Sequence, residues 1–95
     1  MKIELKKFGN LLTSRQDGRE ALAAIEPLLL NMVDNETLEL DFDGVITFTP
    51  SWADEFVTNL VNRFGMRVHF VNDENLSVKV TLKLLQDLKK NPSPN

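Results

Sequence analysis

The sequence predicts a single small domain of the α/β class, with β-α-β-α-β-α order and helices packed on a mixed or parallel sheet. A chain of 95 residues is long enough for only one hydrophobic core. Short apolar segments with a period of two alternate with longer segments of helical period, which is typical of α/β domains. We assign residues 1–90 to the domain and residues 91–95, which are polar and contain two prolines, to a disordered tail.

The first residues predict two short strands. Ile3 and Leu5 alternate with charged side chains, as in a half-buried strand. Gly9 and Asn10 interrupt this pattern, and residues 11–12 predict a brief strand that returns along the first.

A helix is predicted over residues 15–32. Ser14, with Thr13 beside it, is a suitable N-cap, and Asp17 lies where a negative charge favours a helix start. Pro27 lacks a backbone N–H and is expected to bend or end the helix near its position. The face expected to pack on the sheet carries Ala21, Leu22, Ala24, Ile25, Leu28, Leu29 and Met32.

The clearest pair of elements lies in the middle of the chain. Residues 37–42 predict a buried strand that ends at the turn Asp43-Gly44 and has on one face Leu38, Leu40 and Phe42. The next helix has a complete apolar face formed by Ala53, Phe56, Val57, Leu60, Val61 and Phe64. Gly65 is expected to end this helix in the αL conformation.

The last third predicts a strand over residues 66–71, followed by Asn72 and Asp73 as a turn and N-cap. Residues 77–84 fit a strand by their alternation, whereas their continuation to Leu88 fits a helix. We interpret them as a helix because this completes the β-α-β-α-β-α order. Its apolar residues cover more than half of the helix circumference, so we expect a second contact, with a partner protein or in a homodimer.

Composition excludes several classes of function. The net charge of −3 and the scattered Lys and Arg residues do not fit a nucleic-acid-binding surface. The chain has no cysteine, which excludes disulfides and thiolate catalysis. His69, the only histidine, alternates with apolar residues and is expected to face outward. We expect no cofactor. No run is long and apolar enough to span a membrane and no signal peptide is evident, so we expect no membrane partner and a cytoplasmic location.

The segment Asp41-Phe42-Asp43-Gly44-Val45 resembles the first motif of the haloacid-dehalogenase superfamily of phosphotransferases. That resemblance implies a magnesium ion, with Asp41 as the nucleophile toward phosphate and Asp43 as a general acid/base. In that superfamily the motif lies on the first strand of a larger domain, whereas here 40 residues precede it and only 50 follow Val45. A structural turn is the competing interpretation, and a magnesium-dependent phosphohydrolase is the alternative function.

A second resemblance covers about 80 residues. It rests on Leu12-Thr13-Ser14-Arg15 entering a helix and, in order, on residues 40–45, 50–55 and 68–72. These segments are similar to a small bacterial STAS-like domain of unknown function, a distant relative of the STAS domains of anti-sigma factor antagonists. The resemblance implies an α/β fold and a regulatory role in signal transduction, through contacts with a protein such as a histidine-kinase-like ATPase.

The same resemblance implies a modification site. In anti-sigma factor antagonists a phosphorylatable serine lies at the start of the helix that follows this strand, in an Asp-Ser-Ser-Gly setting, and Ser51 takes its place here. The other three positions differ and hold Thr49, Pro50 and Trp52. Ser51 is also a suitable helix N-cap by itself, and a cap at Thr49 with Pro50 in the first helical position is equally suitable.

We predict a partner-binding site, called the rim, at Arg15, Thr49, Ser51, Trp52, Asp54 and Glu55. Trp52 lies off the apolar stripe and is either an exposed interface anchor or a side chain that closes the core over the sheet edge. Arg15 is an ion-pair partner for Asp54 and Glu55 if the two helix starts lie together. The predicted function is a non-enzymatic regulatory module that binds an ATPase- or kinase-type regulator and is switched by phosphorylation of Ser51.

Overall fold

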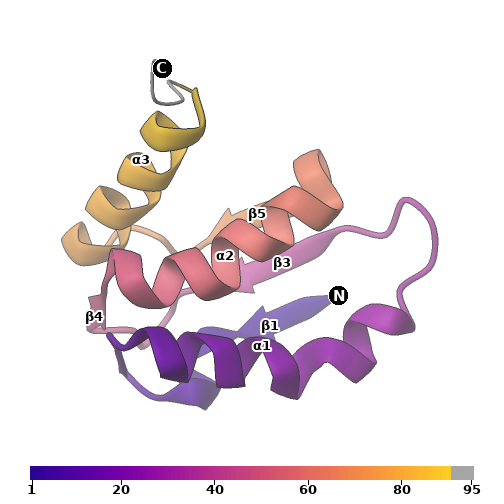
Figure 1. Ribbon diagram of the computed structural model, residues 1–95, viewed down its shortest axis with the longest axis horizontal. Coiled ribbons are helices and arrows are strands. Elements are labelled where there is room, and N and C mark those ends of the chain that lie inside the picture. Colours follow the sequence, from indigo (N-terminus) through magenta and orange to yellow (C-terminus); the bar gives the residue numbers. More distant parts are fainter. Residues whose placement is uncertain (91–95) are drawn as a thin grey trace.

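The computed structural model describes residues 1–90. Its elements are β1 (Lys2–Glu4), η1 (Leu5–Phe8), β2 (Leu11–Leu12), α1 (Arg15–Leu30), β3 (Leu38–Asp41), β4 (Thr47–Phe48), α2 (Pro50–Phe64), η2 (Gly65–Arg67), β5 (Val68–Val71) and α3 (Leu76–Lys90). A parallel sheet in the order β1-β3-β5 forms one layer, and α1 and α2 lie side by side over it (Figure 1). The α/β class is confirmed, and the predicted tail lies outside the described residues.

The sheet has one apolar and one polar face. Ile3, Leu40 and Phe70 are in register across the three strands, and this row faces the helices. The neighbouring row, Lys2, Glu39 and His69, faces the other way. His69 is exposed, as predicted from its alternation with apolar neighbours.

Helix α1 begins as predicted, because the hydroxyl of Ser14 accepts a hydrogen bond of 3.0 Å from the backbone N–H of Asp17. It continues for three residues past Pro27 and ends at Leu30, two residues before the predicted end. Its buried stripe is narrower than predicted and consists of Gly18, Ala21, Ile25 and Leu29.

Helices α1 and α2 approach each other closely at Gly18. A Cβ atom at this position would lie 2.6 Å from the carbonyl oxygen of Trp52, closer than side-chain carbons approach an oxygen. Glycine is therefore required by the neighbouring backbone, although it is a poor helix former. This contact brings the first turns of the two helices together.

Two short strands differ from the predictions. Strand β2 does not return along β1 but pairs in parallel with β4, with Leu11 opposite Thr47 and Leu12 opposite Phe48. Strand β4 was not predicted, because two residues are too few to show a period of two. Leu5 is buried as expected but belongs to the 3-10 turn η1 rather than to the first strand.

The boundary between α2 and β5 also differs. Gly65 follows α2 with φ 58° and ψ −127°, so its φ is positive but its conformation is not αL. Met66 was predicted in the third strand, yet it lies in η2 with an exposed side chain. Strand β5 therefore begins two residues later than predicted.

Residues 77–84, whose pattern fits both a strand and a helix, lie in the helix α3, as predicted. Two of the polar residues that alternate with apolar ones in this segment, Ser77 and Thr81, face β4. Ser77 Oγ accepts a hydrogen bond from the N–H of Phe48 (2.9 Å) and donates one to the carbonyl of Phe48 (3.0 Å). Thr81, one turn later, donates to the same carbonyl (2.7 Å). The cap of α3 is Asn75, whose side chain accepts from the N–H of Val78, and not the predicted pair at residues 72–73.

Candidate functional site

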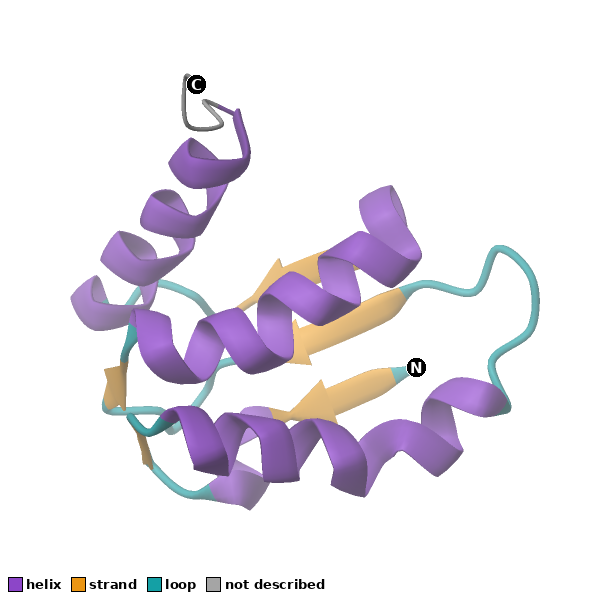
Figure 2. Cartoon of the chain, viewed as in Figure 1, coloured by secondary structure: helices purple, strands orange, loops and turns teal. Residues whose placement is uncertain are grey.

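The carboxyl ends of the sheet strands and the first turns of the helices lie at the same end of the molecule (Figure 2). Asp41 ends β3 and Asn72 follows β5. Arg15 and Ser51 lie in the first turns of α1 and α2. In parallel α/β sheets, ligands bind at this end of the strands. Both of the sites predicted from the sequence therefore lie at the end of the fold where function is expected.

The side chain of Asp41 is almost fully buried, with 4% exposed, and is held by three partners. One carboxylate oxygen, Oδ1, accepts hydrogen bonds of 2.9 Å from the amide of Asn72 and from the backbone N–H of Asp43. The other, Oδ2, lies 3.3 Å from Nζ of Lys2. The hydrogen bond from Asn72, with smaller contributions from Asp43 and Lys2, lowers the pKa of Asp41 below its usual value.

These contacts give Asp41 a structural role. Its carboxylate connects the end of β3 to Lys2 of β1 and to Asn72, which follows β5, and it fixes the turn at Asp43. The Asp43 carboxylate points outward, 4.0 Å from the ammonium group of Lys6. Within residues 1–90, no three His, Asp or Glu side chains gather in a cluster able to hold a metal ion. The geometry therefore favours the structural turn over the phosphohydrolase interpretation of this motif.

The rim contains a network of ion pairs between α1 and α2. The guanidinium of Arg15 lies 3.1 Å from the carboxylate of Asp54 and 2.9 Å from that of Glu55. Arg19, one turn later in α1, lies 3.5 Å from Glu55. Hydrogen bonds to Asp54 and then Glu55 raise the pKa of Arg15. The predicted pairing is confirmed, and Arg19 is a member that the sequence analysis missed.

Thr49 anchors the start of α2 to the end of β2. Its hydroxyl donates a hydrogen bond of 2.8 Å to the carbonyl of Thr13, and its backbone N–H donates to the carbonyl of Leu12. Thr49 occupies the N-cap position with Pro50 in the first helical turn, but its side chain makes no capping bond. Ser51 lies inside the helix and is partly exposed, so of the two alternative N-caps the one at Thr49 is correct and the one at Ser51 is wrong.

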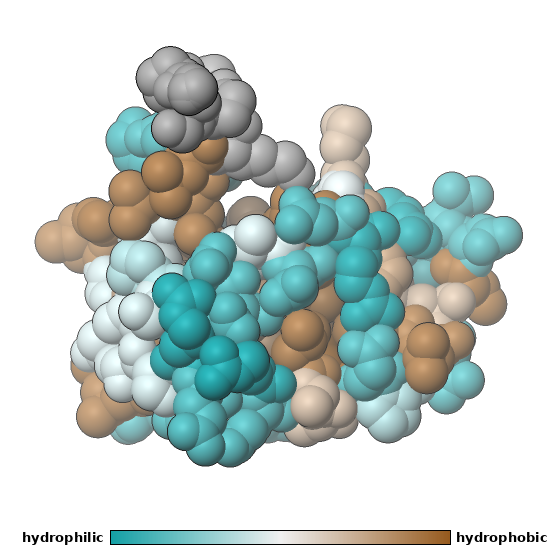
Figure 3. Space-filling model, in the orientation of Figure 1, coloured by the Kyte–Doolittle hydropathy of each residue, from teal (hydrophilic) through white to brown (hydrophobic). Residues whose placement is uncertain are grey.

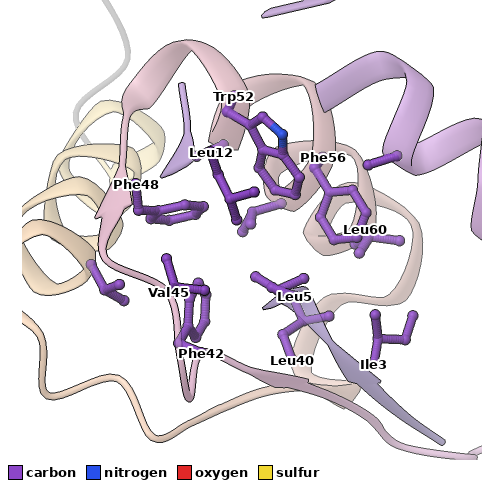
Figure 4. Packing of buried hydrophobic residues seen from close by; sticks show 14 of the residues in the cluster. Ile3, Leu5, Leu12, Leu40, Phe42, Val45, Phe48, Trp52, Phe56 and Leu60 are labelled. Carbon is purple, nitrogen blue, oxygen red and sulfur yellow. The ribbon is translucent and has the colours of Figure 1, made fainter. Parts of the chain in front are cut away.

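Trp52 is a core residue and not an exposed anchor. Only 1% of it is exposed, and its ring packs 4.7 Å from that of Phe56 and 5.9 Å from that of Phe48, between ring centroids (Figure 4). Phe8 from η1 covers the same cluster at 6.2 Å. The alternative in which Trp52 closes the core is therefore correct. Trp52 lies four residues before Phe56, so it extends the apolar stripe of α2 by one turn.

Apolar surface lies away from the rim, around α3. A groove of about 200 Å³ between α2, β5 and α3 is lined mainly by Val61, Val68, Phe70, Leu82 and Leu85. The outer side of α3 also carries exposed aliphatic side chains, visible as hydrophobic surface in Figure 3. The prediction that α3 carries more apolar surface than the domain covers is confirmed.

Comparison with known families assigns the fold. Residues 17–78 match the family described as a STAS-like domain of unknown function (DUF4325). Comparison with curated proteins and with solved structures gave no match. Among residues 1–90, none of the helices is long and apolar enough to cross a membrane. The match covers more than half of the chain and agrees with the parallel α/β architecture, so this chain belongs to the family of STAS-like domains of unknown function.

Proposed function

We propose that this chain is a regulatory module that binds a partner protein through the rim and is switched by phosphorylation of Ser51. The observation that carries the proposal is the network in which Arg15 connects α1 to Asp54 and Glu55 of α2. About half of the Arg15 and Asp54 side chains, 49% and 48%, is exposed. Membership of the STAS-like family supports a role in protein contacts.

The exposed ion pairs contribute little to folding. Pairs between such exposed side chains add little to stability, because water screens their charges. Charges of both signs fixed in one place can nevertheless select a partner with the complementary pattern and speed its association. Arg15, Asp54 and Glu55 are held in place by the close packing of α1 and α2 at Gly18. Trp52 supports this surface from beneath and is not part of it.

Phosphorylation of Ser51 would change this charge pattern directly. Asp54 and Glu55 follow Ser51 by three and four residues, so all three side chains lie on the same face of α2. A phosphate adds about 1.5 to 2 negative charges at neutral pH. It would repel the two carboxylates and compete with them for the guanidinium of Arg15, which binds phosphate well. The modified rim would therefore present a different surface to the partner.

The partner class that we propose is an ATPase- or kinase-type regulator, as the resemblance to anti-sigma factor antagonists implies. An enzyme of this class would both bind the rim and transfer phosphate to Ser51, whose side chain is partly accessible. The proposal therefore joins binding and modification at one surface.

The test compares tagged proteins in affinity capture from the native cells, with ATP and Mg²⁺ present. The variants are Arg15→Glu, Asp54→Lys and Ser51→Glu, and Asp34→Lys is the matched control, because Asp34 is exposed in the loop at the opposite end of the domain. A specific regulator captured by wild type and by Asp34→Lys, but lost from the rim variants, supports the proposal. The intact mass of the captured bait shows whether it carries a phosphate, and Ser51→Ala assigns the position.

A purified candidate partner then gives the quantitative test by titration calorimetry. We expect Arg15→Glu and Asp54→Lys to weaken binding at least tenfold and Ser51→Glu to change it by a similar factor. Equal affinity for wild type and all three rim variants would show that the rim is not the binding site.

A further inference from the structure

The outer surface of α3 carries two parallel ridges. The first ridge is apolar and consists of Leu76, Val80, Leu84 and Leu88, with exposed fractions of 75%, 58%, 41% and 62%. These residues are spaced by four, which places them along one row of the helix surface. The core side of the same helix is formed by other residues, including Val78 and Leu82, so the ridge is not needed for packing within the domain.

The second ridge is charged and runs beside the first. It consists of Lys79, Lys83 and Asp87, all exposed and again spaced by four. The two ridges together form a face about 18 Å long, from the rise of about 1.5 Å per residue over Leu76 to Leu88.

Both ridges are self-complementary about nearly the same point. The apolar ridge is symmetric about position 82 and the charged ridge about position 83. If a second α3 lies antiparallel across a two-fold axis at this point, Leu76 faces Leu88 of the second copy and Val80 faces its Leu84. The same operation brings Lys79 to within about 3 Å, along the helix, of the point opposite Asp87 of the second copy, once on each side of the axis, and the long Lys side chain spans this offset. Lys83 lies near the axis, where its long side chain can extend into water.

We infer that α3 is a self-association surface through which two copies of this chain form an antiparallel two-fold dimer. Ridges of residues spaced by four interdigitate at a crossing angle near −50°, the commonest helix packing class. Two-fold dimers are the commonest symmetric assemblies. Residues 91–95, which follow α3, contain no large apolar side chain that could cover the ridge. The opposite charges of Lys79 and Asp87 favour a second copy over an unrelated apolar occupant.

The first test is sedimentation velocity over a protein concentration series. An interface formed by one helix face from each copy buries less surface than the roughly 1,200 Å² at the lower limit of stable interfaces. We therefore expect a weak dimer, with a dissociation constant of about 10 μM to 1 mM. We expect Val80→Glu to abolish dimer formation at all concentrations in this series. Leu30→Glu is the matched control, because Leu30 is also exposed but lies at the far end of α1. It should leave the dimer unchanged.

The second test exchanges the charges between copies. Lys79→Glu and Asp87→Lys should each weaken the dimer about three- to tenfold, because each places two like-charged pairs in the interface. The double variant should recover the wild-type affinity. An equimolar mixture of the two single variants should also recover it, because each chain then meets its opposite charge in the other. These two residues are eight positions apart on one helix, so recovery cannot come from a contact within the chain.

A wild-type protein that stays monomeric at 1 mM would overturn the inference. So would association that survives Val80→Glu, or a mixture of the single variants that associates no better than either alone. The dimer and the rim are on different elements, so failure of one leaves the test of the other intact. The dimer would likewise be overturned if the wild-type chain stays monomeric over the series but captures a partner protein that Val80→Glu does not capture.

Discussion

The junction of α1 and α2 differs from the junction of α3 with the rest of the domain in how completely each helix is covered. At the first junction, Gly18 allows backbone contact with Trp52, and Arg15 pairs with both carboxylates opposite. At the second, Val78 and Thr81 are buried, but the opposite side of the same helix remains apolar and exposed. The first junction therefore specifies the fold, whereas the second leaves surface free for association.

We expect the largest loss of stability from replacing Trp52. This substitution tests how strongly the junction of α1 and α2 depends on its aromatic cluster. Trp52→Ala removes a fully buried ring and should lower the free energy of unfolding by about 3–5 kcal/mol. Chemical denaturation followed by circular dichroism measures this, since the variant has no tryptophan. Trp52→Phe keeps an aromatic ring against Phe56, so it should lower the free energy of unfolding clearly less than Trp52→Ala does. A loss below 1 kcal/mol for the alanine variant would contradict the buried position.

The second effect concerns the close approach of the two helices. Gly18→Ala would normally stabilise a helix by about 0.5–1 kcal/mol. Here the new methyl group meets the carbonyl of Trp52, so we expect a net loss of about 1–3 kcal/mol in thermal or chemical unfolding. Ala24→Gly on the exposed side of α1 is the control and should cost about 1 kcal/mol by propensity alone. Stabilisation by Gly18→Ala would show that the helices are further apart.

A matched pair of substitutions within α3 compares its two sides. Val78 is fully buried and Val80 is 58% exposed. Val78→Ala should cost about 2 kcal/mol, from two buried methyl groups at about 0.8 kcal/mol each and the cavity that they leave. Val80→Ala should change stability by no more than about 0.5 kcal/mol. Both are measured at low micromolar concentration, below the range proposed for self-association through α3. Equal losses would mean that the outer side of α3 is covered within the domain.

The smallest effect is the pH dependence of the Asp41 contacts. The pKa of Asp41 is lowered in the folded state, so its stabilisation is present above the unfolded pKa near 4 and is lost as the pH falls through the lower folded value. We expect Asp41→Asn to be about 1 kcal/mol less stable than wild type at pH 7. The difference should shrink between about pH 4 and pH 2. A difference that is constant over this interval would show that the carboxylate charge is not involved.

The long periodic elements could be predicted from the sequence because their signals are local. The apolar series along α2 and the alternation in β3 report which side of each element is buried, and no distant residue is needed to read them. The Ser14 cap is also local, since donor and acceptor are three residues apart. The pairing of Arg15 with Asp54 and Glu55 could be predicted because in a β-α-β order the two helices begin at the same end of the sheet.

The sequence by itself therefore determined the α/β class and the order of the main elements, whereas the structure decided that residues 77–84, which also fitted a strand, belong to a helix with an exposed apolar face. The tertiary structure decided the role of individual residues whose partners are distant in the chain. The sequence around Asp41 would be the same for a metal ligand and for a structural carboxylate. Its contacts with Asn72, 31 residues later, and with Lys2 on β1 appear only in the folded chain and give it a structural role. Trp52 became a core residue because β4 and η1 bring Phe48 and Phe8 against it. Periodicity shows which side of a helix is apolar, but what covers that side depends on contacts that form only when the chain has folded.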